Sequence, residues 1–94
     1  MDEELFELEY TDIFVEDINK FKKAGLRNLL KKIELLVNEL KRHPEIRTGH
    51  PEKLKGGTDE MSRRIDSKHR LIYQVDEENK KVFLISAWGH YGDK

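Results

Sequence analysis

The chain has 94 residues, of which 36% are hydrophobic and 39% are charged, and its formal net charge is −1. This length fits one domain, 1–94, with one modest core, and the absence of cysteine excludes a disulfide framework and agrees with a reducing compartment. No apolar run approaches the length of a membrane span and the acidic start lacks the pattern of a signal peptide, so we expect a cytoplasmic protein with no membrane partner.

The charge is unevenly distributed along the chain. Residues 1–20 contain eight acidic residues and one basic residue, whereas residues 41–70 contain nine basic and five acidic residues. Such asymmetry indicates a local basic surface, although a solvated charged face would explain it equally well.

The first half of the chain predicts a strand followed by two helices. "LFELEY" (5–10) alternates as a short strand does, and Thr11 or Asp12 is a good helix N-cap. Gly25 is a natural break between helices, and Pro44 ends the second one. The apolar residues follow helical spacing at Phe14, Ile18 and Phe21, and then at Leu26, Leu29, Leu30, Ile33, Val37 and Leu40.

The second half predicts a loop followed by three strands. Residues 44–58 hold both prolines and three of the six glycines, so we expect loop there. Three strand candidates follow, at 60–66, 69–76 and 80–89, and the last two are joined by a hairpin turn.

Alternation within the predicted strands assigns their faces. Leu71, Tyr73 and Val75 form the more apolar row of 69–76 and should meet the helices, which leaves Arg70 on the opposite face. In 80–89, strict alternation puts Leu84, Ser86, Trp88 and His90 on one row, and Phe83, Ile85 and Ala87 on the other. The expected fold is α+β, with an N-terminal strand and a helical hairpin packed on one face of a small, mostly antiparallel sheet.

Several classes of active site can be set aside. The four histidines lack the spacing of metal ligands and there is no cysteine, so we expect no metal site and no cofactor. The serines lack the context of a nucleophile elbow, and "KGGT" lacks the setting of a phosphate-binding loop.

The residues that remain suit cleavage of RNA by its own 2′-hydroxyl. That reaction needs a base, an acid, and cations around a phosphorane whose negative charge grows. A carboxylate and an imidazole can transfer the protons, guanidinium groups can bind phosphate oxygens, and a tyrosine can stack on a base. The candidates are Glu52, Lys55, Arg63, Arg64, Arg70, His90 and Tyr91.

Three stretches resemble one known family. "GHPEKLKGG", "MSRRIDSKHRLIYQVD" and "ISAWGHYGD" match, in order and spacing, the Txe/YoeB toxins of the RelE-like superfamily. That family's pattern is roughly G-x-P-E-x-L-K, S-R-R-I, H-R-L-[IV]-Y and a closing H-Y. The four pieces lie within residues 49–91, and the helical hairpin before them also fits.

The resemblance implies the toxin of a type II toxin–antitoxin module, a RelE-like fold and a ribosome-dependent, metal-independent messenger-RNA endoribonuclease. It implies Glu52 as general base, His90 as general acid, Arg70 as the group that stabilises the phosphorane, and Tyr91 as the group that orients the nucleotide. Lys55 and Arg64, with Arg63 beside it, would bind backbone phosphate. The implied partners are a cognate antitoxin, the ribosome with its messenger RNA, and a second copy of the chain.

Two departures and two alternatives stay open. The family often has an aromatic pair before S-R-R, where this chain reads "DEM", and its chains commonly end near the tyrosine, where "GDK" follows here. The same fold also suits a ParE-like toxin that poisons gyrase without nuclease chemistry, or a non-catalytic interaction module, because fold alone does not decide function.

Overall fold

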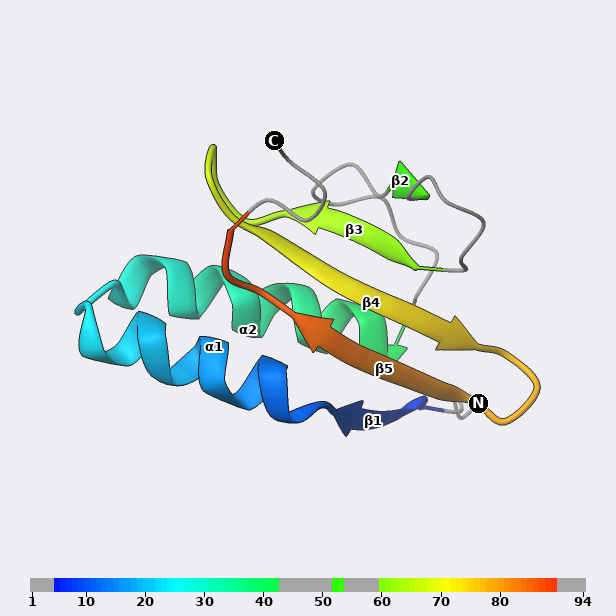
Figure 1. Cartoon of the computed structure of the whole chain (residues 1–94). Helices are drawn as coiled ribbons and strands as arrows, with labels where there is room; N and C mark the ends of the chain where they lie inside the picture. Colours follow the sequence, from blue (N-terminus) through cyan, green and yellow to red (C-terminus); the bar gives the residue numbers. More distant parts are fainter. Residues whose placement is uncertain (1–4, 43–51, 54–59, 90–94) are drawn as a thin grey trace.

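A computed structural model describes residues 5–42, 52–53 and 60–89 of the chain (Figure 1). The elements within these ranges follow one another as β1 (Glu7–Tyr10), α1 (Asp12–Lys23), α2 (Arg27–Arg42), β2 (Glu52–Lys53), β3 (Met61–Arg64), β4 (Arg70–Asp76) and β5 (Lys81–Ser86). The α+β class predicted from the sequence is confirmed. No helix in the described ranges is long and apolar enough to cross a membrane.

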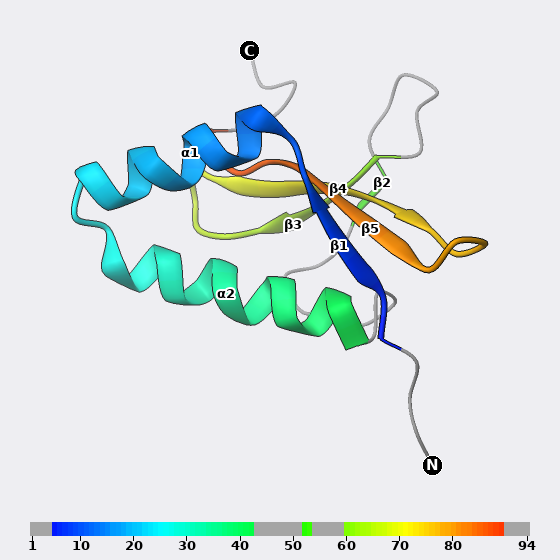
Figure 2. The same cartoon turned by 90° about the horizontal axis from the view of Figure 1, so that it is seen from below.

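Local signals in the sequence define the helical hairpin. Thr11 is the N-cap of α1, and its hydroxyl accepts a hydrogen bond from the Phe14 N–H at 3.0 Å. The same hydroxyl donates to the Ile85 carbonyl at 2.7 Å, which ties the start of α1 to β5. Gly25 has φ of 70°, a left-handed conformation that glycine adopts without strain, and the chain reverses there into α2 (Figure 2).

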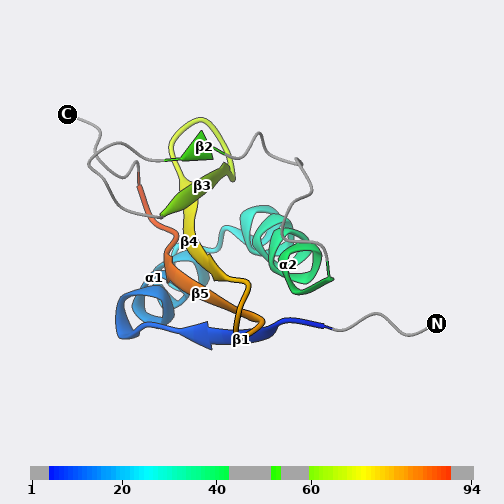
Figure 3. The same ribbon diagram turned by 90° about the vertical axis from the view of Figure 1, so that its right-hand side faces the viewer.

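The strands form one sheet in the order β1-β5-β4-β3-β2 (Figure 3). β1 is parallel to β5, and the other neighbouring pairs are antiparallel. The prediction of loop throughout 44–58 is wrong at Glu52–Lys53, which pair with Ser62 and Met61 of β3. Two residues are too few to show an alternating pattern, so this strand is defined by its partner rather than by its own sequence.

The core lies between the helices and one face of the sheet, which we call the helix face. Its buried members are Phe6, Phe14, Phe21, Ile33, Leu36, Leu40, Ile65, Leu71, Tyr73, Val82, Leu84 and Ala87. Burial of Leu71 and Tyr73 confirms the predicted facing of β4. The alternate residues lie on the opposite face, which we call the far face; in β3 and β4 they are Ser62, Arg64, Arg70, Ile72, Gln74 and Asp76.

A register shift alters the end of β5. Leu84 pairs with Tyr73 and belongs to the core, but Ser86 pairs with Ile72, across an irregularity between Ile72 and Tyr73. Ser86 therefore takes the register of the far face, and the prediction that it shares a face with Leu84 is wrong. A bulge inserts one residue into the alternation, and the sequence carries no mark of it.

Candidate functional site

Two arginines lie side by side on the far face of the sheet. Arg64 closes β3, Arg70 opens β4, and the two residues are direct partners across the strands. Arg64 is exposed and Arg70 is half-buried. Like charges directly opposite one another destabilise a sheet, whereas two guanidinium groups at this spacing suit an anion such as phosphate. This arginine pair is the cationic centre of the candidate site.

β2 brings Glu52 to the same part of the sheet. The backbone register runs from Glu52 to Ser62, then to Ile72, and then to Ser86. Arg64 lies two residues beyond Ser62. With usual strand spacings, the Cα atoms of Glu52 and Arg70 are therefore roughly 12 Å apart. A phosphodiester fits within a backbone separation of that size.

Ser62 and Ile72 lie between Glu52 and the arginine pair in this register. Their exposed fractions are 0% and 1%, although Ile72 does not belong to the core on the helix face. The far face is therefore not open to solvent at these two positions. Chemistry at this face would take place beside a dry surface, where charge–charge interactions are stronger than in water.

The chain leaves β5 through a short segment, Ala87–Gly89, that hydrogen bonds hold in place. The Ala87 and Trp88 N–H groups donate to the Asp17 carboxylate at 2.9 and 3.2 Å. The Gly89 N–H donates to Nδ1 of His69 at 2.8 Å, and the Gly89 carbonyl accepts from the Arg70 N–H at 3.1 Å. Gly89 has φ of 85°, a conformation that favours glycine. The segment therefore ends against the first residue of β4.

Aromatic rings support that exit segment. The His69 ring lies 4.6 Å from the Trp88 ring and 5.0 Å from the Phe21 ring, measured between centroids. Lys20 places its ammonium 5.7 Å from the centre of the Trp88 ring. Trp88 remains 39% exposed, so one part of its ring is packed and another part is accessible.

The turn between β3 and β4 keeps the two arginines in register. The Asp66 carboxylate accepts from the Lys68 and His69 N–H groups at 2.8 and 2.7 Å. Desolvation raises the pKa of Asp66, but these two hydrogen bonds, helped by the charge of Lys68, outweigh it and lower the pKa below its usual value. The carboxylate is thus stabilised in its charged form.

Arg63 does not belong to the site. Its side chain is fully buried on the helix face, where it forms an ion pair with Glu39 at 3.0 Å and donates to the Tyr73 hydroxyl at 3.3 Å. The prediction that Arg63 binds phosphate beside Arg64 is therefore wrong in this structure. Consecutive residues of a strand face opposite ways, and Arg64 alone of the two reaches the far face.

The other predicted residues differ in how far they are described. Arg64 and Arg70 are brought together, and Glu52 is placed by its backbone register. Lys55, His90 and Tyr91 lie outside the described residues. No group of three His, Cys, Asp or Glu side chains that could hold a metal occurs in the described part of the chain.

Sequence reasoning missed Asp17 and His69. Asp17 lies three residues after Phe14 and four before Phe21, so it is an acidic residue on the apolar side of α1. An acidic residue on an apolar helix face indicates a buried carboxylate with a hydrogen-bonding partner, because burying it without a partner is unfavourable. His69 opens the H-R-L-[IV]-Y piece of the family pattern, but the pattern does not show its contact, which is with a glycine 20 residues away.

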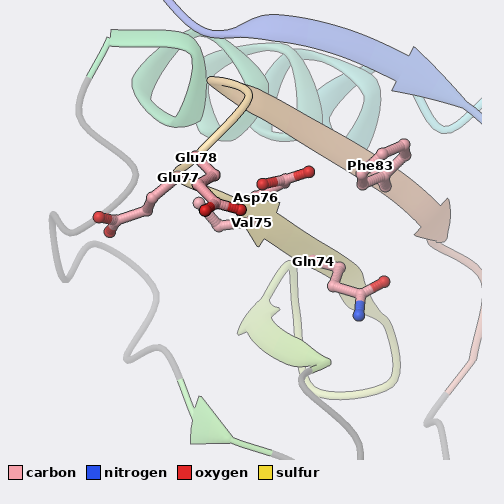
Figure 4. A pocket seen from close by; sticks show the side chains of 6 residues that line it. All are labelled: Gln74, Val75, Asp76, Glu77, Glu78 and Phe83. Carbon is pink, nitrogen blue, oxygen red and sulfur yellow. The ribbon is translucent and has the colours of Figure 1, made fainter.

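A hollow of about 450 Å³ lies at the opposite end of β4 (Figure 4). Its lining residues are Gln74, Val75, Asp76, Glu77, Glu78 and Phe83. Three of them are acidic and would repel a phosphate backbone, so we do not assign RNA to this hollow.

Comparison with known proteins agrees with the resemblance in the sequence. The family described as the YoeB-like toxin of bacterial type II toxin–antitoxin systems matches residues 10–91. A toxin YoeB of Synechocystis is 39% identical over 66 residues, which cover 69% of this chain and 74% of that protein.

Solved structures give the same result. The YoeB dimer from Staphylococcus aureus superposes with a TM-score of 0.80 at 31% identity, covering 94% of this chain and 100% of that one. A YoeB–YefM complex from the same species gives a TM-score of 0.76 at 32% identity, covering 92% and 98%. The chain therefore belongs to the family of YoeB-like toxins of bacterial type II toxin–antitoxin systems.

Proposed function

We propose that the protein is an endoribonuclease that cleaves messenger RNA on the ribosome, with the RNA's own 2′-hydroxyl as the nucleophile. The 2′-oxygen attacks phosphorus and the bond from phosphorus to the 5′-oxygen breaks, leaving a cyclic phosphate and a 5′-hydroxyl. Glu52 takes the 2′-proton and His90 gives a proton to the 5′-oxygen. These proton transfers need no metal ion.

The cationic residues stabilise the charge that develops in this reaction. Arg70 neutralises the phosphorane, while Arg64 and Lys55 bind the flanking phosphates. Tyr91 stacks on the nucleotide and keeps it in line for attack. Membership of the family supports these roles, and they are carried over by position.

One observation carries the proposal: Arg64 and Arg70 are direct cross-strand partners on the far face. Two arginines at directly opposed positions concentrate positive charge on this face, which supports an anionic ligand such as phosphate. The pairing of β2 with β3, which places the backbone of Glu52 beside Ser62, is consistent with a base near that anion.

We further propose that the chain forms a homodimer and is neutralised by a cognate antitoxin. Support comes from relatives, since the Staphylococcus aureus YoeB was solved as a dimer and a YoeB was solved in complex with YefM. Ribosomes and their messenger RNA are found in the cytoplasm, which is therefore the proposed place of action.

The test is to map RNA ends after induced expression in translating cells. Cuts within translated codons with 5′-hydroxyl ends are expected for the wild type and should disappear with Arg70→Ala. Arg27→Ala is the matched control, because Arg27 is an exposed arginine at the start of α2, away from the sheet. Intact messages together with DNA damage would contradict the proposal and favour a ParE-like toxin, and no growth arrest at all would favour an interaction module.

A further inference from the structure

We propose that Asp17 and His69 are positioning residues: together they fix the backbone of Ala87–Gly89 against the start of β4. This inference rests on the proposed function, because it assigns these residues the task of setting the geometry between Arg70 and the residue that follows Gly89. Neither residue contacts the RNA in this scheme.

The β4–β5 ladder cannot perform this task. Its last registered pair is Ile72 with Ser86, and it contains a shift between Ile72 and Tyr73. The three residues that follow Ser86 leave the regular strand. Some other interaction must hold them if they lead to a catalytic group.

Asp17 supplies the first part of that interaction. It is only 5% exposed, although it is an ionisable residue of a surface helix. One carboxylate oxygen accepts from the N–H groups of both Ala87 and Trp88, and Lys20 lies 3.8 Å from the other oxygen. Burying a carboxylate is unfavourable unless it is hydrogen-bonded, so this group acts here as an acceptor for two backbone donors that have left the ladder.

His69 supplies the second part. Its Nδ1 accepts from the Gly89 N–H at 2.8 Å, so this nitrogen carries no proton in the described state. The next residue, Arg70, donates its N–H to the Gly89 carbonyl at 3.1 Å. Two consecutive residues of one segment therefore bind both polar groups of Gly89, and fix its position and the direction in which the chain continues.

The His69 ring is itself immobilised. It packs against Phe21 and Trp88, and the His69 backbone N–H donates to Asp66 at 2.7 Å. The His69 carbonyl accepts from the Ile65 and Asp66 N–H groups at 2.9 and 3.2 Å. A rigid acceptor next to Arg70 couples the exit segment directly to a cationic residue of the site. A misplacement of about 1 Å can reduce a rate about 100-fold.

The test compares His69→Phe with His69→Asn in the purified full chain. Phenylalanine keeps a ring against Phe21 and Trp88 but removes the acceptor, whereas the Asn oxygen can replace Nδ1 at the cost of the ring. We expect His69→Phe to lower the single-turnover cleavage rate on ribosome-bound messenger RNA about 10- to 100-fold at unchanged KM. His69→Asn should recover most of that loss despite being the less well packed variant.

A second comparison isolates Asp17. Asp17→Leu and Glu16→Leu each replace a carboxylate at neighbouring positions of α1 with a side chain that accepts no hydrogen bond, but Glu16 is exposed and, of the two, only Asp17 contacts Ala87 and Trp88. Asp17→Leu should reduce the rate, whereas Glu16→Leu should leave it unchanged. Equal rates for the two variants would overturn the role of Asp17.

Amide hydrogen exchange at Gly89 provides a readout that does not depend on cleavage. Exchange should accelerate in His69→Phe and stay slow in His69→Asn. Equal protection of the Gly89 amide in both variants would overturn the inference, even if their cleavage rates fall. If the wild type cleaves nothing, the proposed function fails, and the exchange experiment still decides whether His69 holds Gly89. Cleavage by His69→Phe at the wild-type rate would also overturn the inference.

Discussion

The two faces of the sheet use the same amino acid in opposite ways. On the helix face, Arg63 is fully buried, paired with Glu39 and hydrogen-bonded to Tyr73. On the far face, one residue further along β3, Arg64 is exposed and lies opposite Arg70. The first arginine completes a core, and the second belongs to the arginine pair to which we assign phosphate binding. A single step along a strand thus separates a buried, paired arginine from one with a proposed role in function.

Substitution of Arg70, on the far face, should have the largest effect on cleavage. Arg70→Ala should reduce messenger-RNA cleavage about 100- to 1000-fold, because it removes a group that neutralises charge in the transition state. The measurement is the single-turnover rate on programmed ribosomes, with urea unfolding of the same sample. Wild-type cleavage by this variant would remove Arg70 from the site.

Substitution of Arg63 tests the helix face. Arg63→Ala leaves Glu39 without this partner and opens space beneath β3, so the free energy of unfolding should fall by about 3 kcal/mol. Arg63→Met, which fills the same space without charge, should cost much less. Urea titrations of both variants provide the measurement. A folded, stable Arg63→Ala that fails to cleave would instead mean that Arg63 has a role in the site.

Arg64→Ala tests whether Arg64 and its neighbour Arg63 have different roles. We expect cleavage to fall about 10-fold and the free energy of unfolding to change by less than about 0.5 kcal/mol, since Arg64 is exposed. The slope of the logarithm of the RNA-binding constant against the logarithm of salt concentration should also fall in magnitude by roughly 1. Binding titrations at several salt concentrations measure this, and an unchanged salt dependence would contradict phosphate contact.

Thr11→Ala changes a contact between α1 and β5 and leaves every arginine in place. It removes the N-cap of α1 and the hydrogen bond to Ile85, so the free energy of unfolding should fall by about 1 kcal/mol. The cleavage rate of the folded fraction should be unchanged. Thermal unfolding and single-turnover assays on one preparation make the comparison. A large loss of rate in fully folded protein would show that the two faces are not independent.

The smallest expected effect concerns Asp66, in the turn that joins the two arginine strands. Its pKa is lowered in the folded state, so the unfolded state binds the proton more readily. The stabilisation is therefore present above the unfolded pKa, about 3.9, and is lost as pH falls through the lower folded pKa. Unfolding of the wild type and of Asp66→Asn from pH 7 to pH 2 should show their difference shrinking toward acid. A difference that grew toward acid would contradict this assignment.

The sequence predicted local features well because local rules govern them. Thr11 was one of two N-cap candidates, with Asp12, and Gly25 was predicted to separate the helices; both signals act over a few neighbouring residues. The facing of β4 followed from alternation, which a strand without a bulge obeys. The motif pattern also led to the correct family.

The candidate site was predictable only in part. Arg64 and Arg70 were both named as site candidates, and the structure pairs them across β3 and β4, but their roles stay predictions. Arg63 was included because a sequence does not say which of two adjacent arginines is buried. Glu52 was assigned to a loop because a two-residue strand has no periodicity of its own. The roles predicted for Lys55, His90 and Tyr91 stay predictions.

By itself, the sequence determined the helices, the strands β1, β3, β4 and β5, and the family, because periodicity, capping residues and motif order are local properties of the chain. Only the tertiary structure decided which arginine joins the core, where β5 changes its register, and how Asp17 and His69 hold the segment after β5. Each of these depends on contacts between residues far apart in the chain; Asp17 and Ala87, for example, are 70 residues apart. Such contacts are set by the way strands pair and helices pack, and no local pattern specifies them.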